Sequence, residues 1–268
     1  MKMKILISFT FFVASTLSAA QPEVLKVCYD QWPPMTMYPS QQDPRRGFVI
    51  EMLSDIYEDA GYDLDFYAVP LARGIDMVSN GLCDLLPENA FSPIEEAGYV
   101  FAEKASFEYP MAFVVRQDDD WQYEGIKSLQ NRQVATGPGW DYSSMSVAYQ
   151  SYLDDPVNFD NIETMTGEDD VVNRILNIIV AKRIDLYADN VLLLKHTLNE
   201  TGLSDQLKIV LAGSEYMLIE KPIFSTKIPI QKRLKLIKIW DEGRSKIDSE
   251  KENYYLKKYG IGFPKNAK

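Results

Sequence analysis

The chain has 268 residues, of which 46% are hydrophobic and 25% are charged, a composition typical of a globular protein with a substantial core. Its net charge of −11 repels a phosphate backbone and argues against a nucleic-acid partner. A single histidine and two cysteines exclude most zinc sites and any disulfide scaffold.

The first twenty residues have the pattern of a secretory signal peptide. Lys2 and Lys4 precede an apolar run at 5–17, and small residues follow at 18–20. A basic start, a short apolar centre and a small-residue end predict cleavage after Ala20. Because the apolar run is short for a bilayer crossing, we expect export of the chain without a membrane anchor.

Strands and helices alternate after residue 21, a pattern that favours parallel sheets with helical crossovers. Short apolar runs in the first half predict strands at 24–29, 64–69, 83–86 and 109–116. Apolar residues at helical spacing predict helices at 48–60 and 71–80, and a glycine follows each of them.

A polar break at 117–120 precedes a second unit of the same kind. This unit is predicted to contain strands at 133–136, 184–188 and 207–211, with a β-prone segment at 215–220. Helices are predicted at 140–153, 168–182 and 190–201, and a long basic helix at 229–247. Two α/β units with a helical tail predict two lobes and a cleft between them.

The strand ends carry the residues that a binding site needs. Ligands of open α/β sheets bind at the carboxyl ends of the strands, which here are predicted at 29–32, 87–92, 136–143 and 188–190. Aromatic, amide, hydroxyl and acidic groups follow these strands, as a site for a small polar metabolite requires.

Several segments, in this order, resemble one known family. They are GFVIEML at 47–53, VPLAR at 69–73, MVSNGLCD at 77–84, SPIEE at 92–96 with Phe101 and Tyr109-Pro110, IDLYAD at 184–189, and Tyr259-Gly260. Together they resemble the bacterial periplasmic solute-binding proteins of family 3, the polar amino-acid type.

The resemblance implies an α/β fold with two lobes, the type II periplasmic-binding-protein or Venus flytrap fold. Lobe 1 would comprise 21–113 and 218–268, lobe 2 would comprise 114–217, and two hinge-crossing strands would join them. The implied function is that of a non-enzymatic periplasmic monomer, without cofactor or metal, that captures a small solute. Its implied partner is the membrane permease of an ABC importer.

One position departs from the family pattern. Family members use an arginine to grip the α-carboxylate of the ligand, whereas this chain has Glu95 there, followed by Glu96. A carboxylate cannot clamp a carboxylate, so an ordinary α-amino acid is not the expected ligand. Asp30, Glu88 and Asp141 add negative charge to the same region and favour a solute with an amine or another cationic group.

The candidate ligand-binding residues are Tyr29, Asp30, Trp32, Arg73, Glu88, Asn89, Phe91, Ser92, Gly139, Trp140, Asp141, Tyr142, Ser143 and Asp189. Asp189 matches the acid that holds the ligand ammonium in the family, or it caps the following helix. The segment 137–143 either presents N–H groups to an anion or is a plain turn. The aromatic residues either stack on a cation or belong to the core. Arg73 either supplies a missing positive charge or forms a solvated ion pair.

Two features remain open from the sequence alone. Cys28 and Cys83 either pair in an oxidising compartment or fill the core as thiols. His196 lies in a predicted helix without a nucleophile motif, so we expect it at the surface or at a boundary, without a catalytic role.

Two alternatives to solute delivery remain as well. The first is a flytrap-fold enzyme of the cyclohexadienyl-dehydratase type, in which Glu88 pairs with Asp141 or Asp189 for acid–base work. The second is a ligand-sensing protein that docks on a membrane sensor instead of a permease.

Overall fold

The computed structural model describes residues 22–90, 98–138, 140–166 and 171–262. In chain order the elements are β1 (Glu23–Tyr29), α1 (Phe48–Asp59), β2 (Tyr62–Ala68), α2 (Leu71–Ser79), β3 (Leu85–Ala90), β4 (Tyr99–Phe101), β5 (Phe107–Arg116), η1 (Ile126–Leu129), β6 (Val134–Thr136), α3 (Val147–Asp154), η2 (Pro156–Asn161), β7 (Ile162–Thr164), α4 (Val171–Val180), β8 (Leu186–Asn190), α5 (Val191–Thr201), β9 (Leu207–Leu211), β10 (Met217–Ser225), α6 (Ile230–Ser245) and α7 (Ser249–Lys257).

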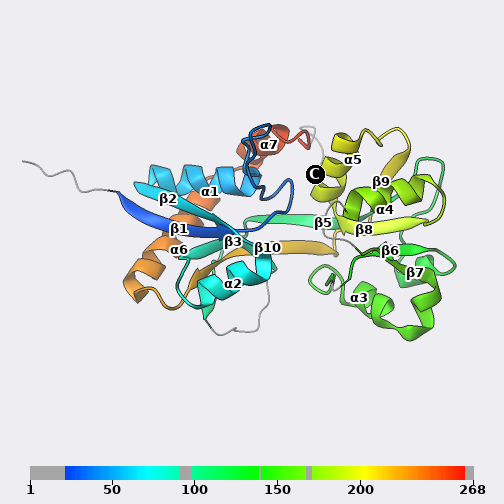
Figure 1. The fold of residues 1–268 in the computed structure, drawn as a ribbon, viewed down its shortest axis with the longest axis horizontal. Coiled ribbons are helices and arrows are strands. Elements are labelled where there is room, and N and C mark those ends of the chain that lie inside the picture. Colours follow the sequence, from blue (N-terminus) through cyan, green and yellow to red (C-terminus); the bar gives the residue numbers. More distant parts are fainter. Residues whose placement is uncertain (1–21, 91–97, 139, 167–170, 263–268) are drawn as a thin grey trace, which may run out of the picture.

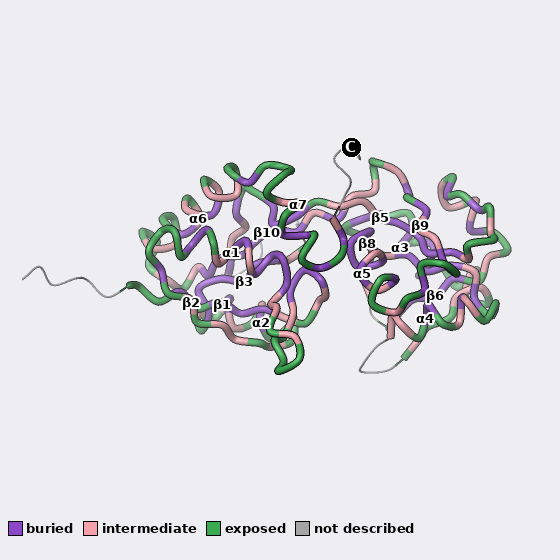
Figure 2. The backbone as a smooth tube through the Cα atoms, turned by 90° about the horizontal axis from the view of Figure 1, so that it is seen from above, coloured by how far each residue is buried: buried purple, intermediate pink, exposed green. Residues whose placement is uncertain are grey.

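These elements gather in two groups along the long axis of the molecule (Figure 1). We call the group of β1–β4, α1, α2, α6 and α7 lobe 1, and the group of β6–β9 with α3–α5 lobe 2. Buried backbone is concentrated on the strands of both lobes, and exposed backbone on the turns and outer helix faces (Figure 2).

The sheet of lobe 1 is built on parallel pairs. β1 pairs with β2, with Glu23 opposite Tyr62, and with β3, with Val27 opposite Leu85. In Figure 1, α1 lies above this sheet and α2 below it. The apolar stripe of α1, which the sequence predicted, is buried against the sheet and α6. Parallel pairing brings the carboxyl ends of β1 and β3 to the same edge, near lobe 2.

Two long antiparallel strands pass from one lobe to the other. β5 pairs with β10 over Phe107–Glu108–Tyr109–Pro110, and from Met111 onward with β8, while β9 flanks its other edge. β10 in turn continues into lobe 1, where it pairs with β3 and β4. All ten strands therefore form one continuous hydrogen-bonded sheet, and β5 and β10 are the covalent connections between its halves.

Lobe 2 repeats the parallel arrangement, with β6 between β7 and β8. In Figure 1, α4 and α5 lie above its strands and α3 lies below. Asn190 caps α5, because its Oδ1 accepts from the backbone N–H groups of Leu192 and Leu193 at 3.0 Å each. Gly202 ends the same helix in a left-handed conformation, with φ of 66°.

The structure resolves the open question about the cysteines. Cys28 and Cys83 form a disulfide with a Cα–Cα distance of 5.9 Å. The bond joins the end of β1 to the segment just before β3, the two strands that carry Asp30 and Glu88 toward the cleft.

Helix α3 begins later than the sequence predicted. The predicted helix at 140–153 starts only at Val147, and the described residues before it form turns. Short polar side chains compete for the backbone there: Asp141 Oδ1 accepts from Ser143 N at 2.7 Å, and Ser146 Oγ accepts from Tyr149 N at 3.2 Å. These bonds favour a turn and then an N-cap.

The carboxyl-terminal helix is also shorter than predicted. The predicted helix at 229–247 is α6, which ends at Ser245, and Asp248 caps the separate helix α7. No helix within the described ranges combines the length and the apolar character that a membrane crossing needs.

His196 is buried, with 7% of its surface exposed, whereas the sequence predicted a surface or boundary position. The segment after α7 covers it: the His196 ring Nδ1 lies 3.4 Å from Tyr259 O, and Asn199 Nδ2 donates to Gly260 O at 2.8 Å. The end of lobe 1 therefore touches α5 of lobe 2, which gives the lobes a contact besides β5 and β10.

Candidate functional site

Three acidic side chains of lobe 1 meet at the sheet edge near lobe 2. Asp30 follows β1, Glu88 lies in β3 and Glu220 lies in β10. Glu88 and Glu220 are only 2% and 4% exposed, and Asp30 is half-buried. We call these three residues the acid cluster.

A hydroxyl group connects two members of the acid cluster. Thr36 Oγ1 lies 2.6 Å from Glu88 Oε1 and 3.3 Å from Asp30 Oδ1. A hydroxyl has a single hydrogen, so it cannot donate to both carboxyl groups at once. The second contact needs a proton on a carboxyl group, which fits a cluster that holds at least one proton.

Sheet pairing and a tight loop create the acid cluster. β1 and β3 are parallel neighbours, and β10 runs antiparallel to β3 with Glu220 opposite Ala90. Thr36 is placed by a turn in which Trp32 and Thr36 exchange backbone hydrogen bonds of 2.9 and 3.1 Å. Gly47 packs against the other side of this loop at φ of 95°, and a Cβ there would lie 2.2 Å from Met35 O.

The described part of the chain provides no compensating positive charge for the acid cluster. Among the described residues, no lysine or arginine forms an ion pair or hydrogen bond with its three carboxyl groups. Burial raises the pKa of Asp30, raises that of Glu88 well above its usual range, and raises that of Glu220 to about 8. The charge of Asp30 adds to the effect on both glutamates.

Lobe 2 contributes a fourth buried acid, Asp189, at the end of β8. The Tyr187 hydroxyl donates to Asp189 Oδ2, and Asn190 donates to Oδ1 from its backbone N at 2.7 Å and from Nδ2 at 3.2 Å. Burial outweighs these bonds and raises the pKa of Asp189 to about 6. Because Asn190 caps α5, the capping role considered for Asp189 belongs to its neighbour.

Trp140 lies close to this fourth acid. Its ring centroid is 5.9 Å from that of Tyr187, the residue that hydrogen-bonds Asp189. The indole also packs on Gly137, where a Cβ would lie 2.3 Å from Trp140 Cε2. Both residues, with Pro138 and Asp141, line a cavity of about 410 Å³ at the end of β6. The segment after β6 therefore holds an aromatic ring next to an acid.

The other predicted site residues have varied positions. Tyr29 is 1% exposed and packs on Phe66, and Trp32 packs on Phe107, so both rings contribute to the core. Asn89 lies at the end of β3, 3.5 Å from the Tyr99 hydroxyl.

In lobe 2, Tyr142 is buried, with its hydroxyl 3.5 Å from Thr136 Oγ1, and Asp141 and Ser143 form an exposed turn. Arg73 forms an exposed ion pair with Asp76 at 2.7 Å on α2. Among the described residues, it forms no ion pair with another candidate site residue. Phe91, Ser92 and Gly139 lie outside the described residues.

Sequence reasoning missed Thr36, Tyr187 and Glu220. Thr36 lies in a proline-rich loop without a motif. Tyr187 is linked to Asp189 in the sequence only by its position two residues earlier in the same predicted strand. Glu220 did carry a signal, because an acid followed by one lysine within the largely apolar run MLIEKPIF is unusual for a buried strand.

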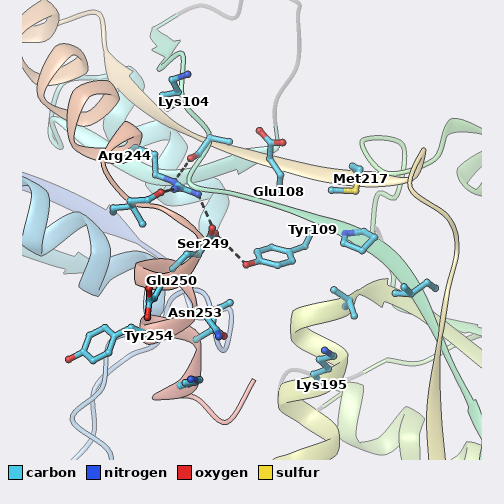
Figure 3. Close-up of a pocket in the computed structure, with 18 of the residues that line it drawn as sticks. Lys104, Glu108, Tyr109, Lys195, Met217, Arg244, Ser249, Glu250, Asn253 and Tyr254 are labelled. Atoms are coloured by element: carbon cyan, nitrogen blue, oxygen red, sulfur yellow. Dashed lines mark hydrogen bonds and ion pairs between the residues drawn. The ribbon is translucent and has the colours of Figure 1, made fainter. Parts of the chain in front are cut away.

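A second, larger cavity of about 1560 Å³ lies between α7 and α5, against β5 and β10 (Figure 3). None of the predicted site residues lines it. One ion pair lies at this cavity: Arg244 Nη2 is 3.2 Å from Glu252 Oε1, to which the Tyr109 hydroxyl also donates at 3.3 Å. Among the described residues, the carboxyl groups of the acid cluster have no such ion pair.

The chemistry of these groups suits binding more than metal coordination. Among the described residues, no group of three or more histidine, cysteine, aspartate or glutamate side chains is arranged to hold a metal ion. Buried carboxyl groups and an aromatic ring instead offer hydrogen bonds and a stacking surface.

Solved structures resemble this fold over most of its length. The probable amino-acid ABC transporter extracellular-binding protein ytmK from Bacillus subtilis superposes with a TM-score of 0.67 at 16% identity, over 89% of this chain and 97% of that chain. A histidine kinase sensor domain with similarity to periplasmic binding proteins superposes with a TM-score of 0.64 at 15% identity, over 91% of this chain and 99% of that chain. The L-cystine solute receptor of Neisseria gonorrhoeae, in the unliganded open conformation, superposes with a TM-score of 0.64 at 15% identity, over 90% of this chain and 95% of that chain. These likenesses establish the α/β, type II periplasmic-binding-protein fold.

Sequence comparison gives the family. No curated protein matches the chain. The sequence profile of the bacterial extracellular solute-binding proteins, family 3, matches residues 25–259, which include β1 through α7 and both connecting strands. The chain therefore belongs to the bacterial extracellular solute-binding proteins, family 3.

Proposed function

We propose that this protein captures a small polar solute with an amine or another cationic group by closing two lobes on it. Lobe 1 would extend over 21–113 and 218–268, and lobe 2 over 114–217. The observation that carries the proposal is that the two lobes are joined through the β5–β10 pair: β10 also pairs with β3 and β4 in lobe 1, and β5 also pairs with β8 and β9 in lobe 2. Bending of these two strands, with movement of the segment 259–260 on α5, would let the lobes approach each other.

Closure follows from differential affinity. A solute that touches both lobes binds the closed form more tightly than the open form and shifts the population toward it. In lobe 1 the contacts would come from the acid cluster, and in lobe 2 from Asp189 and Trp140. Because burial raises the pKa of these four acids and no lysine or arginine among the described residues pairs with them, a positively charged solute gains the most from binding beside them.

Delivery to the permease of an ABC importer is the proposed destination. The chain would act in the periplasm as a monomer, after removal of residues 1–20, and without chemical change of the solute. Protein sequencing of the exported form should start at Gln21, and an importer role predicts solute uptake that is lost when the gene is deleted.

Small-angle X-ray scattering tests closure directly. We expect the radius of gyration of the chain lacking residues 1–20 to fall when a bound solute is added, and to stay constant in the Asp189→Ala and Trp140→Ala variants at the same solute concentration. An unchanged radius of gyration in the presence of saturating solute would refute capture by closure. Conversion of the solute, followed by NMR, would instead indicate the dehydratase-type alternative.

A further inference from the structure

The acid cluster contains a carboxyl oxygen that no hydroxyl, amide, lysine or arginine group of the described chain reaches. Oε2 of Glu88 is buried and has no hydrogen-bond partner among the described residues. Leaving a buried acceptor unpaired costs about 1–3 kcal/mol, more when the group is charged. Such an orphaned oxygen beside two further acids indicates a missing donor.

The donor that fits must carry N–H groups and a positive charge. A neutral donor would satisfy Oε2 but would leave the acid cluster uncompensated, and a quaternary ammonium has charge but no hydrogen to donate. A protonated amine or a guanidinium supplies both, with charge-assisted hydrogen bonds that are about twice as strong as neutral ones. The half-buried Asp30 is where the cluster reaches the surface.

We propose that Asp30, Glu88 and Glu220 form a proton-linked cation subsite, in which an ammonium or guanidinium group of the solute binds between the carboxyl groups and displaces the proton they hold. This inference rests on the proposed solute-binding function. The displaced proton passes to the solvent, and the solute's charge takes its place beside the carboxylates.

The groups around the subsite support this exchange. Thr36 lies between Glu88 and Asp30, and burial together with the charge of Asp30 raises the pKa of Tyr38. The nearby Arg46 is engaged elsewhere, with Nη1 3.2 Å from the Tyr29 hydroxyl and its guanidinium 4.8 Å from the centroid of the Phe66 ring. The unliganded carboxyl groups reduce their mutual repulsion by remaining protonated, and their raised pKa values are consistent with this.

Calorimetric titration tests the subsite. The cationic probes are putrescine, agmatine and L-lysine; choline serves as a cation without N–H groups, and succinate and glucose as solutes without positive charge. We expect at least one N–H cation to bind, with choline at least tenfold weaker. For one displaced proton, affinity should rise up to tenfold per pH unit between pH 6 and 7, and titrations in two buffers of different ionisation enthalpy should show the proton release.

Variants assign the effect to the acid cluster. Glu88→Gln and Asp30→Asn should each lower the affinity for the best cation at least tenfold, and Glu220→Gln should flatten its pH dependence. Glu58→Gln, which changes an exposed acid on α1, is the matched control and should change neither. Melting temperatures of all four variants establish that each is folded, and the half-buried Asp30 gives a variant that tests the subsite if Glu88→Gln does not fold.

The outcomes separate this inference from the proposed function. Failure of all three N–H cations to bind, equal binding of choline, or unchanged affinity in Glu88→Gln and Asp30→Asn would overturn the subsite. If succinate or glucose binds and reduces the radius of gyration, the subsite is wrong and capture by closure stands. If a cation binds without reducing the radius of gyration, the subsite stands and capture by closure is wrong.

Discussion

Thr36 Oγ1 lies 2.6 Å from Oε1 of Glu88, whereas Oε2 of the same carboxyl group is buried without a partner among the described residues. One oxygen of this carboxyl group therefore has a hydrogen-bond partner among the described residues, and the other has none. The pair joins a loop residue to a strand residue 52 positions further along the chain, so the contact exists only in the folded state.

Glu220→Gln should stabilise the unliganded protein at pH 8. Burial raises the pKa of Glu220 from 4.5 to about 8, so between these values the folded state binds more protons than the unfolded state. The contribution of Glu220 to stability is fully present below pH 4.5 and is lost as pH rises through 8. At about 1.4 kcal/mol per pKa unit, the expected gain in melting temperature at pH 8 is at least about 5 °C, with little gain at pH 5.

Scanning calorimetry at pH 5, 6, 7 and 8 measures this difference. The exposed Glu58→Gln should give a curve parallel to that of the unaltered protein. A Glu220→Gln curve that is also parallel would show that Glu220 does not titrate with a raised pKa.

Replacing both cysteines, as Cys28→Ser with Cys83→Ser, should destabilise the protein without abolishing its fold. The disulfide links residues 55 positions apart, and closing a loop of that length in the unfolded chain corresponds to about 4 kcal/mol. We expect the melting temperature to fall by about 8–16 °C, and reducing agent to lower that of the unaltered protein only. Identical melting of the two proteins under oxidising conditions would contradict a stabilising role for this bond.

Gly137→Ala should weaken solute binding by displacing Trp140. A Cβ at position 137 would lie 2.3 Å from Cε2 of the indole, so the ring has to move away from Tyr187. We expect a loss of affinity for the best cation of the same order as in Trp140→Ala, measured by titration calorimetry. The matched control is Gly202→Ser: no atom lies within 4 Å of a Cβ there, so a loss of stability without loss of affinity is expected.

Asp189→Asn should reduce affinity for the cation about tenfold or more, because a charge-assisted hydrogen bond is worth about 1.5–3 kcal/mol. It should not lower the melting temperature at pH 7, because burial disfavours the ionised Asp189, whose pKa is about 6. Tyr187→Phe removes the hydroxyl that donates to this carboxylate and should raise the pKa of Asp189 further. Affinity in Tyr187→Phe should therefore fall most at pH 6. Equal losses at pH 6 and pH 8 would argue against titration of Asp189.

Local sequence patterns predicted much of the fold. The apolar run of β1, the alternation in β2 and the apolar stripe of α1 depend on neighbours a few residues apart, and the structure has strands and a helix there. The start of α3 was wrong because Asp141 and Ser146 bond to the backbone and delay the helix, which hydrophobic spacing alone does not reveal.

The candidate site was predicted only in part. Asp30, Glu88 and Asp189 were identified because they follow predicted strands, and their burial without a cationic partner appeared only in the structure. Their role in binding stays a prediction. Thr36 and Glu220 depend on a loop turn and on antiparallel pairing of distant strands, so no local pattern could place them beside Glu88.

The sequence by itself determined the alternation of strands and helices, the segments that resemble family 3 and the excess of acids at the strand ends. Those features are local or compositional, and each can be recognised from residues that are close together in the chain. Only the tertiary structure decided that Cys28 bonds to Cys83, that His196 is buried under Tyr259, and that the Thr36 hydroxyl meets Glu88. These contacts join residues 52 to 63 positions apart, and their proximity depends on how the sheet orders its strands.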